Sequence, residues 1–222
     1  MDCIFTKTYH EPEFNIKEIL RYMGCSDESG EVLSLINQCI AEIRPKLAYR
    51  LCYRQFTIEQ KGDFWDLSFV STNSKDLGNN LKGCTSIILF AATIGIEIDR
   101  LIAKYGKLSP SKALCFQAIG AERIESLCNS FNNDMKSLLG EKGLFLRPRF
   151  SPGYGDFSLE VQKNIFRVLE PGKKIGVSLN DSLLMSPSKS VTAIIGVSPC
   201  NYLSIANRQC DFCRKNDCSY RR

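Results

Sequence analysis

The stretch Cys84-Thr85-Ser86-Ile87-Ile88-Leu89-Phe90-Ala91-Ala92-Thr93-Ile94-Gly95 decides the fold of this 222-residue chain. Apolar residues follow one another in it without the polar alternation of a strand that has one face in water. A run of this kind is typical of a strand that is buried on both faces. We therefore expect it to be the central strand of a sheet.

Further strands are predicted on both sides of this run. Residues 51–70 carry β-branched and aromatic residues in partial alternation around Lys61-Gly62-Asp63, which predicts a hairpin. Leu144–Leu146, Ile175–Leu179 and Val191–Val197 are shorter strand candidates. Strands mixed with helices in no regular βαβ order indicate an α+β fold, with a mainly antiparallel mixed sheet that is flanked by helices.

Several helices are predicted from apolar periodicity and from their end signals. Apolar residues recur at helical spacing within residues 14–23. The apolar residues within 32–43 mark one face of a longer amphipathic helix. A third helix is expected near residues 96–105, with Gly106 closing it. Ser109-Pro110 then gives an N-cap followed by a proline at the first helical position, so a long helix is expected from Pro110 into the 130s.

Glu125 occupies an unusual place on this long helix. With 100° of rotation per residue, Glu125 falls in a narrow and otherwise apolar stripe of the helix, on the face that should pack against the rest of the protein. An unpaired buried charge is costly, so the carboxylate either lies at the edge of the interface or is held by a cationic partner. The other members of the stripe are Leu114, Ala118, Ala121 and Cys128.

Composition predicts one main domain of a soluble globular protein. Apolar residues make up 44% of the chain and charged residues 24%, which excludes disordered and fibrous classes. We divide the chain into an N-terminal helical and hairpin lobe (1–83), a core (84–199) and a cysteine-rich tail (200–222). No run reaches the roughly 18–20 apolar residues of a membrane span, and the start lacks a secretion signal. We expect a cytoplasmic protein without a membrane partner.

The net charge of +5 is concentrated at the C-terminus. Residues 208–222 contain five basic and two acidic residues, which accounts for +3, so the body is nearly neutral. Proteins that bind nucleic acids usually carry a basic stripe over a face or groove. Only the tail offers anything similar, so nucleic acid is the least favoured partner.

Arg147-Pro148-Arg149-Phe150-Ser151-Pro152-Gly153-Tyr154-Gly155-Asp156 is a stiff loop rich in ligand-binding side chains. The prolines restrict the backbone, and the glycines permit turns or close approach of the backbone. Arg149 offers a planar fork of donors for a carboxylate or phosphate, and Tyr154 offers a ring and a hydroxyl. Asp156 or Ser158 is expected to cap the next helix, whose positive end would favour an anion. The loop is either such a binding site or a structural turn with a surface arginine.

The last 23 residues contain four of the eleven cysteines, Cys200, Cys210, Cys213 and Cys218. The spacing Cys-x-x-Cys lets two sulfur atoms reach one metal, so these thiolates could hold zinc or an iron–sulfur cluster. The alternative is a tail of reduced thiols, because the chain lacks an export signal.

Four of these segments occur together in a characteristic order. They are Ala92–Gly95, the helix that carries Glu125, Arg149–Tyr154 and Leu183–Val191. In this order the chain resembles the activation, or reactivation, domain of vitamin B12-dependent methionine synthase, and stand-alone members of that superfamily. The Arg-x-x-Pro-Gly-Tyr element is the most specific piece of the resemblance.

The resemblance implies a binding site for S-adenosyl-L-methionine. In that family the arginine contacts the methionine carboxylate, the loop frames the ligand, and a helix glutamate lies close to it. Carried over by motif, the site residues are Glu125, Arg149, Ser151, Pro152, Gly153 and Tyr154.

The resemblance also implies a role in reductive methylation of cob(II)alamin. The chain would be an accessory component of a cobalamin-dependent methyltransferase, with an electron donor such as flavodoxin or ferredoxin. It lacks the corrinoid-binding Asp-x-His-x-x-Gly motif, and its single histidine is His10. The cobalamin is therefore expected on a partner, a corrinoid-binding methionine synthase or methyltransferase.

Two other functions remain open at this point. One is a metal-binding or iron–sulfur redox module that acts through the C-terminal cysteines, with the loop only structural. The other is nucleic-acid binding by residues 208–222, which should then be weak and sensitive to salt.

We predict that protein purified without oxygen carries zinc, or iron with sulfide, on the four tail cysteines. Replacing Cys210 and Cys213 by serine should remove the bound metal, because both thiolates of the Cys-x-x-Cys pair are lost. Elemental and sulfide analysis measures this, with Cys3→Ser as the control that keeps its metal. Absence of zinc, iron and sulfide from the wild type would contradict the prediction.

Overall fold

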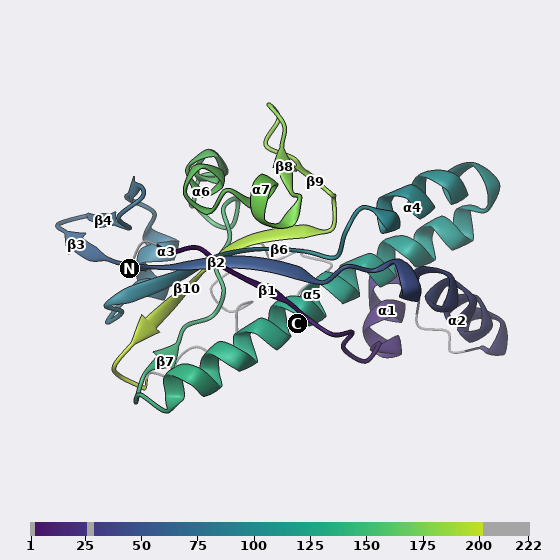
Figure 1. Ribbon diagram of the computed structural model, residues 1–222, viewed down its shortest axis with the longest axis horizontal. Helices are drawn as coiled ribbons and strands as arrows, with labels where there is room; N and C mark the ends of the chain where they lie inside the picture. Colours follow the sequence, from purple (N-terminus) through teal and green to yellow (C-terminus); the bar gives the residue numbers. More distant parts are fainter. Residues whose placement is uncertain (1–2, 26–28, 202–222) are drawn as a thin grey trace.

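The structure is a computed structural model that describes residues 3–25 and 29–201 (Figure 1). Its main sheet has five strands in the order β1-β2-β6-β10-β7, and all neighbouring strands are antiparallel. This confirms the predicted α+β fold with an antiparallel sheet flanked by helices. The strands are β1 (Phe5–Thr8), β2 (Arg50–Thr57), β6 (Ser86–Thr93), β7 (Phe145–Leu146) and β10 (Ser190–Ser198).

Strand β6 is the centre of the sheet, as its sequence predicts. It pairs along its full length with β2 on one side and β10 on the other, and all eight of its residues are buried. Successive side chains point to opposite faces. Those of Ile88, Phe90 and Ala92 enter one hydrophobic cluster, and those of Ile87, Leu89 and Ala91 enter the other.

One face of the sheet is covered by the long helix α5 (Pro110–Gly140), which crosses it (Figure 1). Phe131 of α5 packs on the rings of Phe90 and Tyr53, with centroid distances of 5.1 and 5.2 Å. The first half of α5 lies against three further helices. These are α1 (Ile16–Met23), α2 (Gly30–Ile43) and α4 (Glu97–Leu108).

The stripe predicted for α5 is wrong at its N-terminal end. Leu114 is 48% exposed, whereas Cys115, Phe116 and Ile119 are fully buried. The reason is that this part of α5 packs on neighbouring helices instead of the sheet, so a different face of the helix is covered.

The other face of the sheet is covered by shorter elements. Helix α3 (Lys75–Leu81) lies there with α6 (Val161–Leu169) and α7 (Pro171–Ile175), and together they bury the second cluster. Two small sheets complete the fold. One consists of β3 (Glu59–Lys61), β4 (Phe64–Asp66) and β5 (Ser71–Thr72), and the other of β8 (Ser178–Leu179) and β9 (Met185–Ser186).

The structure corrects three local predictions. The hairpin of residues 51–70 shrinks to β3 and β4, because β2 is used by the main sheet between β1 and β6. Helix α4 does not end at Gly106 but at Leu108. The strand expected at Ile175–Leu179 is reduced to β8, which pairs with β9 outside the main sheet.

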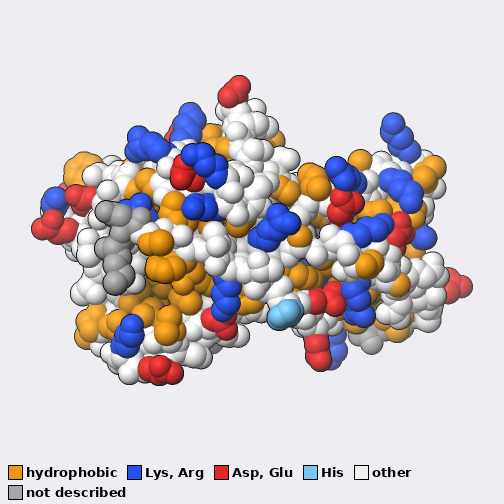
Figure 2. All heavy atoms as spheres, in the orientation of Figure 1, with side chains coloured by type: hydrophobic (Ala, Val, Ile, Leu, Met, Phe, Trp, Pro, Cys, Tyr) orange, Lys and Arg blue, Asp and Glu red, His pale blue; other side chains and the backbone are white. Residues whose placement is uncertain are grey.

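Charged side chains of both signs are interspersed over the face shown in Figure 2, as expected for a nearly neutral body. Hydrophobic side chains gather on this face around β1, β7 and the C-terminal half of α5. Phe5 and Leu138 are among the exposed large hydrophobic residues. Among the described residues, no helix combines the length and the hydropathy that a membrane crossing requires.

We predict that Phe131→Ala lowers the free energy of unfolding by about 3–5 kcal/mol, because it leaves a cavity between α5 and β6. Leu114→Ala on the same helix removes a half-exposed side chain, so it should change the free energy of unfolding by less than about 0.5 kcal/mol. Urea denaturation followed by circular dichroism measures both variants. Equal losses would mean that the sheet-facing side of α5 is assigned wrongly.

Candidate functional site

The start of the Arg147–Asp156 loop is fixed against β10. The Arg147 N–H donates to the Gly196 carbonyl at 2.8 Å, and Phe150 exchanges two backbone hydrogen bonds with Ile194, at 2.9 and 2.8 Å. The Pro148 carbonyl accepts from the Asn80 side chain at 3.2 Å. The backbone of Arg149 is therefore held between two anchors on the central sheet.

The side chain of Arg149 reaches across to α5. Its Nη2 lies 3.0 Å from Oε2 of Glu125, and its Nη1 lies 2.9 Å from Oδ1 of Asn129. The side chain of Arg149 is 17% exposed and that of Glu125 is 37% exposed. The two alternatives for Glu125 thus combine, since it lies at the edge of the helix interface and is also held by a cation.

Asn129 is a member of this cluster that the sequence analysis missed. It lies four residues after Glu125, and residues at that spacing are neighbours on one helix face. The spacing is the only signal in the sequence that could have found it.

The remaining predicted site residues form a turn beyond Phe150. Pro152 is buried, whereas Tyr154 is 65% exposed. Gly153 has a φ of 90°, and its N–H donates to the Phe157 carbonyl at 2.8 Å. The Tyr154 N–H donates to the carbonyl of Ser151 at 3.2 Å. The turn is thus compact, with its tyrosine facing outward.

An open cavity of about 340 Å³ lies beside Glu125, between α5 on one side and α1 with the segment that leads into it on the other. Four carboxylates line it, and three of them, those of Glu18, Glu122 and Glu125, are each paired with an arginine. Its lining consists of Glu13, Asn15, Glu18, Tyr22, Glu122, Glu125, Ser126 and Asn129. Glu125 and Asn129, which hold Arg149, therefore belong to the wall of this cavity.

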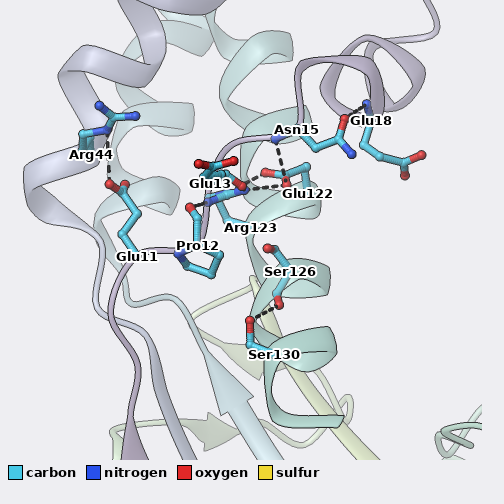
Figure 3. Close-up of polar contacts among 10 residues, drawn as sticks. All are labelled: Glu11, Pro12, Glu13, Asn15, Glu18, Arg44, Glu122, Arg123, Ser126 and Ser130. Atoms are coloured by element: carbon cyan, nitrogen blue, oxygen red, sulfur yellow. Dashed lines mark hydrogen bonds and ion pairs between the residues drawn. The ribbon is translucent and has the colours of Figure 1, made fainter. Parts of the chain in front are cut away.

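The inner wall of the cavity depends on a buried ion pair (Figure 3). The side chain of Arg123 is fully buried, and its guanidinium is hydrogen-bonded to both oxygens of the Glu122 carboxylate. It also donates to the carbonyls of Pro12 and Glu13. Its guanidinium carbon lies 3.9 Å from the centroid of the Phe14 ring. One side chain thus attaches residues 12–14 to the middle of α5.

The charge on Arg123 is retained despite its burial. Burial opposes the charged form, but the hydrogen bonds and charge of Glu122 outweigh it and raise the pKa of Arg123. Glu122 also accepts from the Asn15 N–H at 3.3 Å. Each partner of the pair therefore has contacts that compensate for its removal from water.

This pair was not predicted, although the sequence carries a signal for Arg123. Arg123 lies seven residues after Phe116 and four before Leu127, so all three share one face of α5. Both apolar residues are fully buried.

Two further predictions concern residues outside this cluster. Neither Asp156 nor Ser158 is the N-cap of the next helix, because α6 begins only at Val161 and has Glu160 at its N-cap. The Asp156 carboxylate accepts hydrogen bonds at the start of α3 instead. The first N–H groups of α6, those of Val161 and Gln162, donate to the carbonyls of Ser158 and Leu159.

The cysteine tail is only partly described. Cys200 is exposed, and its N–H donates to the Ser198 hydroxyl at 3.1 Å. Cys210, Cys213 and Cys218 lie outside the described residues. Within residues 3–25 and 29–201, no three histidine, cysteine or acidic side chains lie close enough to hold a metal ion. The metal site remains a prediction.

Comparison with known proteins bears on the fold. No family model and no curated protein matches this sequence. Among solved structures, the chain is similar to the crystal structure of the MetH reactivation domain bound to AdoHcy, with a TM-score of 0.63 and 16% sequence identity. The match covers 89% of this chain and 79% of that one. This likeness confirms the predicted reactivation-domain fold, and it extends well beyond the segments that carry the motifs.

We predict that Arg123→Ala lowers the free energy of unfolding by about 3–5 kcal/mol, because Glu122 would be left buried without its partner. Arg21→Ala is the matched control. It breaks a half-exposed ion pair with Glu18 and should cost at most about 1 kcal/mol.

Urea denaturation measures both variants of this test. The double variant Glu122→Leu/Arg123→Met, which removes both charges, should be more stable than Arg123→Ala. A double variant as unstable as the single one would show that contacts other than the ion pair account for the loss.

Proposed function

We propose that this protein binds S-adenosylmethionine and acts as a reactivation factor for a partner corrinoid-dependent methionine synthase or methyltransferase. The observation that carries the proposal is the Arg149–Glu125 pair at the wall of an acidic cavity. It occurs in a fold whose solved counterpart is bound to AdoHcy. AdoHcy is the molecule that S-adenosylmethionine becomes when it gives up its methyl group.

The charges of this site match those of the methionine part of the ligand. The ligand carries a carboxylate, an ammonium and a sulfonium group. The guanidinium of Arg149 suits the carboxylate, since its planar fork can donate two parallel hydrogen bonds. Glu125 and Glu13, a second carboxylate of the cavity, suit the two cations.

The turn after Arg149 supplies the remaining contacts in this proposal. Tyr154 presents an exposed ring and a hydroxyl, and Gly153 lets the backbone approach the ligand closely. Ser151 adds a hydroxyl, and buried Pro152 fixes the backbone between them. Together these four residues would frame the ligand, while Arg149 and Glu125 hold its charged end.

The chain's own task is to bind and orient the methyl donor. The partner's cobalamin, after receiving one electron from a donor such as flavodoxin or ferredoxin, would take the methyl group and leave S-adenosylhomocysteine. No covalent step falls on this chain, so we regard it as an accessory component of the methyltransferase. The cysteine tail is proposed to bind zinc or an iron–sulfur cluster, supported by its spacing.

We predict that the wild type binds S-adenosylmethionine and that Arg149→Ala weakens binding about 10- to 100-fold. The reason is the loss of charge-assisted hydrogen bonds worth about 1.5–3 kcal/mol. Isothermal titration calorimetry measures this. Arg100→Ala on α4 is the control, because it also removes an arginine from an Arg–Glu pair, with Glu97 at 2.6 Å. Its affinity should equal that of the wild type.

Two outcomes would contradict this proposal. Absence of binding by the wild type, or binding by Arg149→Ala as tight as that of the wild type, would refute the proposed S-adenosylmethionine site. The reactivation role is tested by mixing the protein with a candidate cob(II)alamin protein, S-adenosylmethionine and a reductant, and recording methylcobalamin absorbance. Failure with every corrinoid partner tried, despite intact ligand binding, would refute the role and leave the site.

A further inference from the structure

Asp156, at the end of the loop, is joined to α3 by a reciprocal set of hydrogen bonds. Its carboxylate accepts from the Lys75 N–H at 2.8 Å, from the Asp76 N–H at 3.2 Å, and from the Ser74 hydroxyl. In return, the Asp156 N–H donates to the Asp76 carboxylate at 3.2 Å. Two segments about 80 residues apart thus satisfy each other's polar groups.

This contact takes over part of the capping of α3. The first N–H groups of a helix have no partner inside the helix. Ser74 is the N-cap and satisfies the Leu77 N–H with its own side chain, at 3.1 Å. Asp156 satisfies the N–H groups of Lys75 and Asp76. Burial raises the pKa of Asp156, but these hydrogen bonds outweigh it and hold the pKa below its usual value, so the group is ionised at neutral pH.

Gly155 shows how closely the two segments approach. It has a φ of 53°, and a Cβ added to it would lie 2.2 Å from the Asp76 carboxylate. A larger residue would therefore push the turn away from α3. On the other side of Tyr154, the hydrogen bond from Gly153 to the Phe157 carbonyl closes the turn, and Phe157 is buried. Tyr154 is thus held by backbone contacts on both of its sides.

The two ends of the loop have separate anchors. Arg149 is placed by backbone hydrogen bonds from its neighbours to β10. The turn that carries Tyr154 is placed by α3 through Asp156. Helix α3 is itself fixed, because Leu77 and Leu81 are fully buried. Asn80 of α3 also reaches the Pro148 carbonyl beside Arg149, but Asp156 contacts α3 only at its start, so the Tyr154 turn depends on Asp156 more directly than Arg149 does.

We infer that Asp156 is a positioning residue for the binding of S-adenosylmethionine, which holds the Tyr154 turn against α3 so that the tyrosine meets the ligand. The inference rests on the proposed function. It assigns the site two main supports, which are β10 together with Asn80 for the Arg149 end and the Asp156 contact to the start of α3 for the Tyr154 turn. Loss of the Asp156 contact should then act mainly through Tyr154.

A double-mutant cycle tests this dependence, with the dissociation constant of S-adenosylmethionine measured by calorimetry. Asp156→Ala should weaken binding about five- to tenfold in the wild type and in an Arg149→Lys background. In a Tyr154→Leu background it should have almost no further effect, since coupled sites are not additive. Asp66→Ala is the control, a carboxylate on β4 that pairs with Lys61 and accepts from the Ser68 N–H. It should bind like the wild type.

Gly155→Ala is a second variant that keeps the Asp156 side chain. It should weaken binding in the same Tyr154-dependent way, because the added Cβ meets Asp76. Hydrogen exchange of the amides of residues 153–157, without ligand, should be faster in both variants than in the wild type.

Three other outcomes would contradict either the role of Asp156 or the proposed function. Lower stability of Asp156→Ala with unchanged affinity would reduce Asp156 to a helix cap and overturn the inference. An equal loss of affinity with and without Tyr154 would overturn it as well. Absence of ligand binding by the wild type would instead refute the proposed function, and this inference with it.

Discussion

The burial of β6 on both faces is the constraint on which the rest of the structure depends. Its backbone is satisfied by β2 and β10, and its apolar side chains leave no face for water. Each face must therefore be covered by a layer of helices. Helix α5 covers one face and α3, α6 and α7 cover the other, so the loop between β7 and α6 can contact both layers. The candidate site is a consequence of this arrangement.

Two Arg–Glu pairs whose glutamates lie on α5 show how burial decides the role of a charge. The pair of Arg123 and Glu122 is almost fully removed from water and is surrounded by backbone groups. It attaches the chain before α1 to α5 and has little freedom to meet a ligand. The pair of Arg149 and Glu125, one turn further along, borders an open cavity and is partly exposed. The same kind of ion pair thus stabilises the fold where it is buried, and it remains accessible to a ligand where it borders the cavity.

The sequence predicted several residues of the candidate site, but not the residues that hold them in place. The resemblance to the reactivation domain selected Glu125 and Arg149, and the structure brings them within 3.0 Å of each other. Asn129 and Asp156 escaped prediction in these roles, because their partners lie 20 and about 80 residues away along the chain. Apart from the four-residue spacing of Glu125 and Asn129, local sequence gives no signal for such contacts. The same reason explains why β2 was taken for half of a hairpin when it pairs with β1 and β6.

The sequence by itself determined the elements whose causes are local. The uninterrupted apolar run made β6 a central strand, Gly24 ended α1 in the left-handed conformation, and Ser109-Pro110 marked the start of α5. Tertiary structure alone decided which face of α5 is buried at each end and which carboxylate each arginine meets. It also decided that Asp156 serves α3 and not the helix that follows it. These outcomes depend on the free energy of bringing distant segments together. The pattern of side chains within a single helix or strand does not encode that free energy.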